Sequence, residues 1–412
     1  MTATTLFYIL IAIIVINFLF EKILSILNAK HFSDELPREV NDVYDSEAYQ
    51  KSQSYKKTNF SFSLISSSFS LLITLAFFFL DGFKIVNDFA LGFSDNTILT
   101  TLIFFGVLSI GSDILSTPFS YYKTFVIEEK FGFNKSTKKL FWIDKIKGLT
   151  MLIVVGGLVL ALITWFYEFT GVYFWLYAWA LVTAFTVFMN MFYSSLIVPL
   201  FNKQTPLEEG ELKTAIENFA QLVGFKLDNI YVIDGSKRST KANAYFTGFG
   251  ATKRIVLYDT LINDLDTDEI VAVLAHEIGH YKHRHTIFNL IASILLTGFT
   301  LYILSLLVGN ILLSEALGVQ ESSFHIGLVA FAILYSPISE ITGLIMNSIS
   351  RKFEYQADNY AKKFFSATPL ISSLKKLSKN SLSNLTPHKA FVFFHYSHPT
   401  LVQRIRNLNL KS

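Results

Sequence analysis

The sequence of 412 residues contains no cysteine. Disulfide bonds and thiolate metal ligands are therefore excluded, so any metal site must be built from His, Asp or Glu. Charged residues make up only 16% of the chain, and the net charge of +3 is small. Because nucleic-acid surfaces need clustered positive charge, we expect no nucleic-acid partner. No internal repeat and no linker marks off an independent second domain.

The sequence is instead rich in apolar residues: they make up 51% of it, and phenylalanine alone occurs 41 times. This composition is too apolar for a soluble protein of this size. A helix needs about 20 apolar residues to cross a bilayer. Seven stretches are candidates for such spans: 6–27, 60–80, 97–118, 149–166, 172–200, 286–313 and 324–349. The first has neither a basic region before it nor a cleavage pattern after it, so we interpret it as a retained span rather than a signal peptide.

Lysine and arginine fall almost entirely on alternate loops between these spans, and Lys84 is the only basic residue in the loops assigned to the other side. Loops rich in basic residues face the cytoplasm. The pattern predicts an external amino terminus and two cytoplasmic polar pieces, which we expect to form one catalytic domain. The predicted order is spans one to five at 1–200, a cytoplasmic domain at 201–285, spans six and seven at 286–350, and a C-terminal catalytic segment at 351–412.

Segment 201–285 has the pattern of a small α/β domain. Apolar residues recur at helical spacing over 212–223. Three β-rich runs follow, at Ile230–Ile233, 244–249 and Arg254–Tyr258, and turns with Gly and Lys separate them. Asp266 and Glu269 then form a capping-box pattern at the start of another helix. The sequence thus predicts a mainly α-helical, polytopic membrane protein with about seven transmembrane helices and a small cytoplasmic α/β domain.

That last helix carries the pattern HExxH, formed by His276, Glu277 and His280. Residues four apart lie on one face of a helix, so both imidazoles can bind one Zn²⁺ while Glu277 reaches the attacking water. We therefore expect a zincin-like catalytic domain with one zinc ion, in which Glu277 is the general base for hydrolysis of a peptide bond. Other divalent ions also bind such ligands, so zinc is the first expectation among several metals.

A catalytic zinc ion usually has a third protein ligand. The extended pattern HExxHxxGxxH fails at positions 283 and 286, and we interpret His283 and His285 as interfacial or supporting groups. After the last span, Glu354 and Asp358 lie one helical turn apart on one face. We expect Glu354 to be the third ligand and Asp358 to orient a metal-bound imidazole through its far nitrogen. The alternative is that both carboxylates are solvated charges on a helix.

These residues belong to a longer pattern that resembles the type I CAAX prenyl proteases, which are integral-membrane zinc endopeptidases that process farnesylated proteins and, in animals, prelamin. The resemblance covers nearly the whole chain. Its matches are 127–134 (IEEKFGFN), 199–203 (PLFNK), 243–246 (NAYF), 276–280 (HEIGH), 354–358 (EYQAD), 397–399 (SHP) and Arg404. The resemblance implies that the seven helices enclose a large water-filled chamber, with the zinc site facing inward at its cytoplasmic end.

The resemblance also implies roles for residues outside the metal site. Asn243 would begin an edge strand along which the substrate lies extended, so that Asn243, Ala244 and Tyr245 contact the peptide. His398, together with Arg404, would bind the substrate or stabilise the negative charge that develops on the carbonyl oxygen. His398 and Asp358 are therefore counted with Glu277 as catalytic, and Arg404 as a substrate contact.

The implied function is membrane-embedded zinc endoproteolysis near the C-terminus of prenylated CAAX-type substrates. The expected partners are a peptide or protein, with or without a prenyl group, and the lipid bilayer. Missing insertions and retrieval signals favour a bacterial plasma (inner) membrane over the endoplasmic reticulum, where unprenylated or misfolded membrane proteins would be alternative substrates. Charged residues on both sides of HExxH argue against an intramembrane site-2-type protease. A transporter or channel with a structural zinc is the alternative from another class, and it would not need Glu277.

Overall fold

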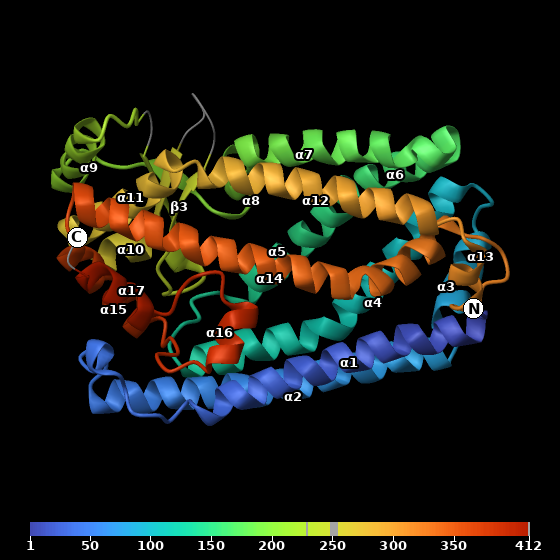
Figure 1. Ribbon diagram of the computed structural model, residues 1–412, viewed down its shortest axis with the longest axis horizontal. Helices are drawn as coiled ribbons and strands as arrows, with labels where there is room; N and C mark the ends of the chain where they lie inside the picture. Colours follow the sequence, from blue (N-terminus) through green and yellow to red (C-terminus); the bar gives the residue numbers. More distant parts are fainter. Residues whose placement is uncertain (228–229, 248–253, 411–412) are drawn as a thin grey trace.

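The computed structural model describes all residues except 228–229, 248–253 and 411–412, and it shows a long helical bundle with a small sheet at one end (Figure 1). The first helices are α1 (Ala3–Lys30), α2 (Ser46–Phe79), α3 (Gly82–Leu91), α4 (Thr97–Tyr122), α5 (Lys138–Met151), α6 (Gly157–Thr170), α7 (Phe174–Leu196) and α8 (Val198–Phe201). The later helices are α9 (Glu211–Leu222), α10 (Asp259–Asp264), α11 (Thr267–Lys282), α12 (His285–Leu307), α13 (Ile311–Glu315), α14 (Phe324–Phe364), α15 (Ala367–Asn380), α16 (Lys389–His395) and α17 (Leu401–Asn409). The strands are β1 (Gln204–Pro206), β2 (Ile230–Ile233), β3 (Ala244–Thr247) and β4 (Arg254–Tyr258).

Six helical stretches among the described residues are long and apolar enough to cross a membrane. One of them, Lys138–Phe201, has 64 residues, which is far more than the roughly 20 needed for one crossing. It reverses at Gly171, whose φ of 52° is a conformation that side chains other than glycine's rarely adopt. Helices α6 and α7 pack against each other on either side of this turn. The stretch therefore contains two spans, and the prediction of about seven is confirmed.

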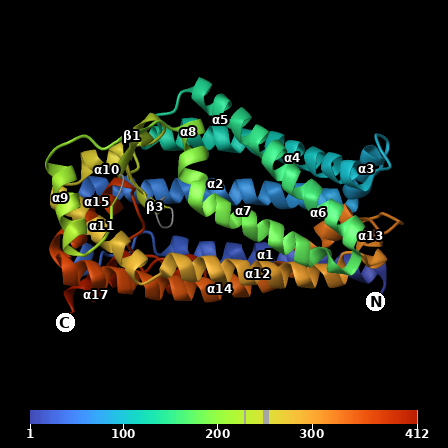
Figure 2. The ribbon, with the colours of Figure 1, turned by 90° about the horizontal axis from the view of Figure 1, so that it is seen from above.

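The two ends of the bundle differ in structure (Figure 2). At the end that holds the amino terminus, the short helices α3 and α13 pack against the start of α1 and bury Leu6, Phe83 and Leu313 together. At the opposite end, Tyr44 and Phe133 from two basic loops pack with C-terminal residues such as Leu385 and Ile405. The loops that carry the basic residues thus gather beside the predicted catalytic segments, as the alternation of charge along the sequence predicts.

Few residues in the apolar spans are buried inside the protein. In the most apolar 18-residue window of each stretch, only 6–17% of the residues are buried. Helices around a solid core would each bury a complete face. The low fraction fits helices that form a wall around an open interior, as the resemblance implies. Asp113, which lies in an otherwise apolar span, pairs with Lys145 on α5 at 2.7 Å.

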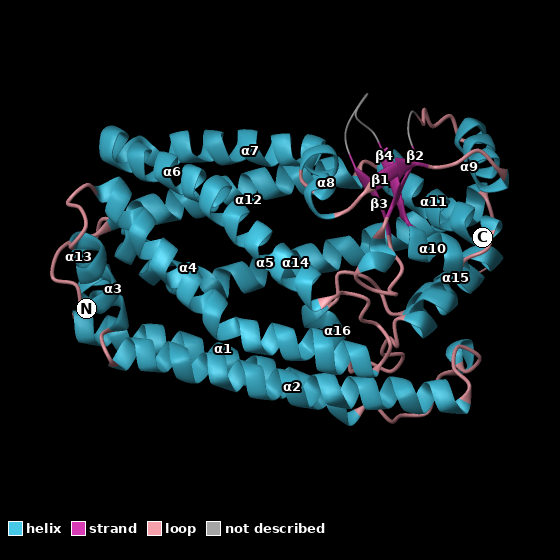
Figure 3. Cartoon of the chain, turned by 180° about the vertical axis from the view of Figure 1, so that it is seen from behind, coloured by secondary structure: helices cyan, strands magenta, loops and turns pink. Residues whose placement is uncertain are grey.

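The sheet lies at the end of the bundle beside α8, α9 and α11 (Figure 3). Its strand order is β1-β2-β4-β3, with β2 and β4 parallel and the two outer pairs antiparallel. Strand β3 is therefore an edge strand. Ile255 and Leu257 of β4 are buried against Ile270 and Leu274 of α11. β2 and β4 have the predicted bounds, and β3 begins at the predicted Ala244; residues 248–249 of the third predicted run lie outside the described residues.

Helix α14 connects the membrane spans to the catalytic segments without a break. It runs for 41 residues from Phe324 to Phe364 and passes through the predicted boundary at residue 350. The sequence analysis placed a span and a separate helix here. The last span and the carboxylates near residue 354 therefore belong to one continuous helix.

Candidate metal centre and active site

The start of α11 is fixed by hydrogen bonds that close its first turn. Asp266 and Glu269 form a capping box, in which Glu269 Oε2 accepts from the Asp266 backbone nitrogen at 2.9 Å. Glu269 is buried and also contacts α15, where Lys376 Nζ donates to it at 2.8 Å. The predicted capping box is therefore present, and it holds the helix that carries HExxH at a fixed orientation.

Gly279 lets α11 approach α14 very closely. A Cβ atom at this position would lie 3.0 Å from the Cα atom of Ala357 and 3.0 Å from the Cβ atom of Tyr360. Ala357 itself is fully buried. The small residues on both helices set a short distance between the helix axes, so that side chains from α14 reach those of α11.

We expect Gly279→Ala to push the two helices apart and to weaken metal binding at least about tenfold, since backbone atoms of α14 cannot move aside locally. Metal affinity of the purified variant, measured by competition with a chelator, tests this. Gly343→Ala on α14 is the matched control, because a Cβ atom there would meet nothing within 4 Å. It should bind metal as the wild type does. Equal affinity in Gly279→Ala would contradict the role of the close approach.

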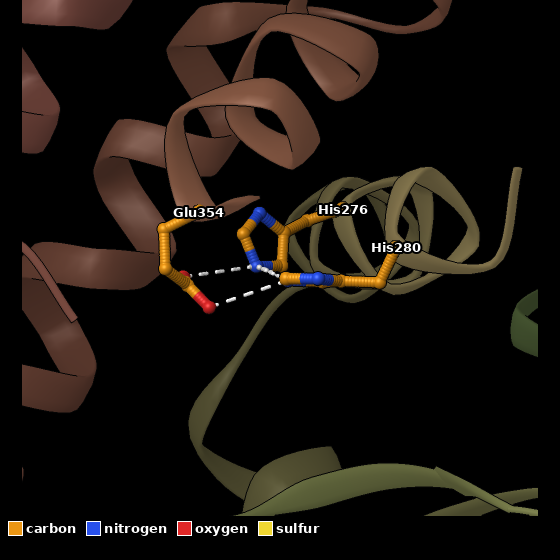
Figure 4. Close-up of side chains that lie close together, drawn as sticks. All are labelled: His276, His280 and Glu354. Atoms are coloured by element: carbon orange, nitrogen blue, oxygen red, sulfur yellow. Dashed lines mark hydrogen bonds and ion pairs between the residues drawn. The ribbon is translucent and has the colours of Figure 1, made fainter. Parts of the chain in front are cut away.

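The predicted ligands meet where α11 lies against α14. His276 and His280 project from one face of α11, and Glu354 points toward them from α14 (Figure 4). The two Nε2 atoms lie 3.1 Å apart. Glu354 Oε2 is 3.4 Å from His276 Nε2, and Glu354 Oε1 is 3.3 Å from His280 Nε2. Glu354, which follows His280 by 74 positions in the sequence, thus forms one cluster with the two histidines.

The cluster fits one small divalent metal ion. A tetrahedral centre with bonds of roughly 2.0–2.1 Å separates neighbouring ligand atoms by about 3.3 Å. The two Nε2 atoms are 3.1 Å apart, and each lies 3.3–3.4 Å from the nearer Glu354 oxygen, Oε2 for His276 and Oε1 for His280. Glu354 Oε2 is buried and accepts no hydrogen bond from the described residues. Its nearest donors, His276 Nε2 at 3.4 Å and Arg404 Nη1 at 3.7 Å, are too distant for a good hydrogen bond, so a metal ion would supply the interaction that this buried oxygen lacks. Two imidazoles and one carboxylate are also a known ligand set for catalytic zinc.

Asp358 supports His276 from behind. Its Oδ1 atom lies 2.9 Å from His276 Nδ1, and its side chain is completely buried. Arg404 on α17 donates to both Asp358 oxygens, from Nη2 and from Nε. Because Nδ1 of His276 donates to Asp358, its Nε2 lone pair faces the other ligands. The geometry expected of Asp358 is therefore present.

The pKa of His276 in the metal-free site reflects two opposing effects. Burial lowers it, but the attraction of the Asp358 and Glu354 carboxylates outweighs burial and raises the pKa of His276 to about 9. The imidazole is therefore protonated at neutral pH until a metal displaces its proton. We expect the zinc affinity of metal-stripped protein to rise about tenfold per pH unit between pH 7 and 9. Competition with a chelator at several pH values tests this, and an affinity that is constant over the window would contradict it.

His285, which the sequence analysis interpreted as an interfacial or supporting group, lies behind His280 together with Gln356, a partner that the sequence analysis did not name. His285 is buried, and its Nδ1 atom lies 3.0 Å from His280 Nδ1. The other nitrogen of His285 lies 2.8 Å from Gln356 Oε1, which only accepts. His285 therefore donates to Gln356 and accepts from His280, so that His280 Nε2 is free for the metal. Gln356 lies inside the predicted segment 354–358, but its pairing with His285 depends on the helix crossing.

A cavity of about 520 Å³ opens in front of the three ligands. Glu277 lines it beside His276 and His280, and His398 and Arg404 line it from the C-terminal segment. One side is apolar and consists of Leu261, Val273, Leu370, Leu374 and Leu377. The cavity therefore combines a carboxylate beside the metal ligands with an apolar wall, which suits a peptide with apolar side chains.

The edge strand β3 reaches this cavity with its first residues. Asn243 and Ala244 line the cavity. The Asn243 carbonyl accepts from Tyr258 N on β4, so the backbone groups of the next residue, Ala244, face the open edge. Tyr245 differs from the expectation: its hydroxyl lies 3.3 Å from Ser194 Oγ on α7, so its side chain points to the membrane helices and not into the cavity.

His398 and Arg404 lie beside the metal ligands in different environments. His398 Nε2 is 3.2 Å from Glu354 Oε1, and 63% of its side chain is exposed to the cavity. Only 12% of the Arg404 side chain is exposed, and its guanidinium group is paired with Asp358. His398 is thus free to contact a substrate, whereas Arg404 acts first on Asp358. The sequence analysis assigned a substrate contact to Arg404 and did not foresee this pairing.

Comparisons with known proteins agree with this geometry. A family model for "CAAX prenyl protease N-terminal, five membrane helices" matches residues 25–203, and a model for "Peptidase family M48" matches residues 206–411. The CAAX prenyl protease 1 homolog of Dictyostelium discoideum is 38% identical over 92% of this chain and 90% of its own length. CAAX prenyl protease 1 of Saccharomyces cerevisiae is 37% identical over 96% of this chain and 93% of its own.

The crystal structure of S. mikatae Ste24p superposes with a TM-score of 0.94 and 37% sequence identity, and the match covers 98% of this chain and 99% of that one. The relatives share almost the full length, so they extend over both the membrane helices and the metal-binding end. The chain is therefore a multi-pass membrane metalloprotease and belongs to the CAAX prenyl protease 1 family.

Proposed function

We propose that this enzyme is a zinc endopeptidase that hydrolyses peptide bonds near the C-terminus of prenylated CAAX-type substrates. The observation that carries the proposal is the convergence of His276, His280 and Glu354 in a cavity that Glu277 also lines. The names of the relatives, CAAX prenyl proteases, support the choice of substrate class. His276, His280 and Glu354 would hold the zinc ion, as they were assigned from the sequence.

Zinc in this position would polarise a peptide carbonyl and make an attacking water more acidic. Glu277 takes the proton from that water and then delivers it to the leaving amine, since its carboxylate lines the cavity next to both histidines. His398 can donate a hydrogen bond to the carbonyl oxygen as negative charge develops on it. Asp358 and Arg404 act from behind the site by keeping His276 in one tautomer.

The substrate would lie extended along β3. Edge strands bind peptides by adding a strand, and the outward backbone groups of Ala244 are available for this. In the absence of substrate, the Ala244 backbone nitrogen donates to Asn243 Oδ1 at 2.9 Å. A substrate carbonyl would replace this contact, which frees the Asn243 amide for the peptide. Tyr245 pairs with Val256 of β4, so it does not face the open edge; it contributes by anchoring the strand to α7.

Two peptides of identical sequence, one farnesylated at the cysteine of a CAAX end and one unmodified, test the substrate class. The proposal predicts a kcat/KM at least tenfold higher for the farnesylated peptide, with loss of the last three residues. Equal cleavage of both peptides would contradict the preference for prenylated substrates. It would favour the alternative, a protease that acts on unprenylated membrane or misfolded proteins.

The side of the membrane that the active site faces is inferred from the charge of the loops. Under the positive-inside rule, the end that carries the basic loops and the active site faces the cytoplasm. Protease protection of tags at the amino terminus and in the 201–210 region tests this orientation. Residence in a bacterial plasma membrane rather than the endoplasmic reticulum stays a prediction, which fractionation of the source cells tests.

A further inference from the structure

One segment of the family pattern, residues 127–134, takes no part in the metal site. It follows α4, starts in the π-helical turn Lys123–Glu128 and belongs to the membrane half of the chain. In the structure it lies against residues 238–241, which lead into the edge strand β3. The contact therefore joins the membrane helices to the part of the active site that would hold the substrate.

The two segments are connected through their backbones. Asn134 and Ser239 form an antiparallel β-bridge. The Lys135 backbone nitrogen donates to the Arg238 carbonyl at 3.0 Å, and the Thr240 nitrogen donates to the Phe133 carbonyl at 3.1 Å. These bonds fix the position of residues 238–241 relative to the segment that follows α4.

A cluster of three side chains closes the contact, and we call Tyr55, Glu128 and Lys241 the strand clamp. Lys241 Nζ lies 3.0 Å from Glu128 Oε2 and 3.1 Å from the Tyr55 hydroxyl. The Tyr55 hydroxyl donates to Glu128 Oε1 at 2.7 Å. Lys241 also lies over the Phe133 ring, with Nζ 4.3 Å from its centre. Only 16% of the Glu128 side chain is exposed, against 38% of the Lys241 side chain, so the carboxylate is shielded from water more than in an ordinary surface ion pair.

Lys241 is only two residues before Asn243, and the chain between them is held on its other side by the sheet. Thr260 Oγ1 donates to the Lys241 carbonyl at 3.2 Å, and Tyr258 N donates to the Asn243 carbonyl at 3.1 Å. A shift of Lys241 must therefore be passed on to the residues that line the cavity.

We propose that Glu128 and Lys241 are positioning residues, which set the place of the edge strand relative to the metal ligands. The inference rests on the proposed function, since it assumes that the peptide lies along β3. Neither residue touches the substrate or the metal ligands. The strand clamp makes the binding of a peptide depend on the arrangement of α2 and α4. It also assigns a structural role to the segment 127–134. A displacement of about 1 Å in a bound substrate can reduce turnover about a hundredfold, so a small shift of the edge strand would have a measurable effect on activity.

The test compares Lys241→Met with the wild type on one peptide substrate. We expect KM to rise about 10- to 100-fold, while zinc content stays unchanged and kcat falls less than KM rises. Lys241→Arg should keep KM within about threefold of the wild type, because it restores the pairing with Glu128. The double variant Glu128→Lys with Lys241→Glu should recover most of the loss of either single variant. Lys213→Met is the matched control, because within the described part of the chain the ion pairs of Lys213 are with Glu209 and Glu217, on the surface around α9.

Amide hydrogen exchange of residues 243–245 provides a second measurement that needs no substrate. We expect exchange there to be at least tenfold faster in Lys241→Met than in the wild type and in Lys213→Met. A KM within twofold of the wild type together with unchanged exchange would overturn the inference. Zinc loss in step with activity would also overturn it, because the clamp would then support the metal site. A wild type that cleaves no peptide would contradict the proposed function instead, and the exchange result would still decide on the clamp.

Discussion

Glu277→Gln is expected to reduce kcat by about 10²- to 10⁴-fold and to leave the zinc content unchanged. Glutamine has nearly the same shape as glutamate, so the cavity and the neighbouring His276 and His280 keep their places. It cannot accept the proton of the attacking water. Steady-state kinetics together with metal analysis of the same preparation measures both quantities.

Glu217→Gln is a suitable control for this variant. Glu217 lies on α9, half of its side chain is exposed, and its ion pair with Lys213 is long at 4.0 Å. We expect its kinetics to equal those of the wild type. Activity that survives in Glu277→Gln would show that another group removes the proton, and His398 would be the first candidate because it lines the same cavity.

Glu354→Ala should lower the affinity for zinc at least about 100-fold, since it removes one of three ligands. Asp358→Ala should lower it less, by about 10–100-fold, because Asp358 acts through the orientation of His276. Competition with a chromogenic chelator ranks the two variants on one scale. The fold should persist in Glu354→Ala, because Arg404 and His276, which lie near Glu354 Oε2, keep their closer contacts with Asp358.

A different result for Glu354→Ala would change the assignment of the third ligand. If Glu354→Ala binds zinc as tightly as the wild type, Glu354 is not a ligand. His398, whose Nε2 atom lies 3.2 Å from Glu354 Oε1, would then be the nearest replacement. The double variant Glu354→Ala with His398→Ala would identify it by a further loss of affinity.

The metal cluster could be predicted because each half of it is local in the sequence. His276 and His280 are one turn apart on a helix, and so are Glu354 and Asp358, so helical periodicity alone places each pair on one face. Their meeting in space was an inference from the need for a third ligand. The structure adds the cause of the meeting, which is the close approach of α11 and α14 at Gly279.

Contacts between distant segments were beyond the sequence analysis. The pairing of His285 with Gln356 joins two helices at a particular rotation, and no periodicity within either helix reveals it. The orientation of Tyr245 toward α7 depends on where the sheet lies relative to the spans. The strand clamp likewise joins residues from α2, the end of α4 and the connection to β3, so only the assembled fold shows it.

The spans were predicted well in number but less well at their ends. A composition window finds apolar stretches, but the break between α12 and α13 follows from Asn310, whose side chain caps the second helix. The continuity of α14 was missed for the opposite reason. Charged residues after position 350 end its apolar stretch, but the helix continues to Phe364 because it packs against α11 there.

Removal and return of the metal tests the central claim most directly. The wild type and Glu277→Gln should be stripped with a chelator, given back one equivalent of zinc, and assayed in detergent on a farnesylated CAAX peptide. The account predicts that stripped wild type is inactive, that one equivalent of zinc restores cleavage, and that Glu277→Gln binds the same equivalent without regaining activity. Cleavage by fully stripped wild type, or equal recovery in both proteins, would contradict it.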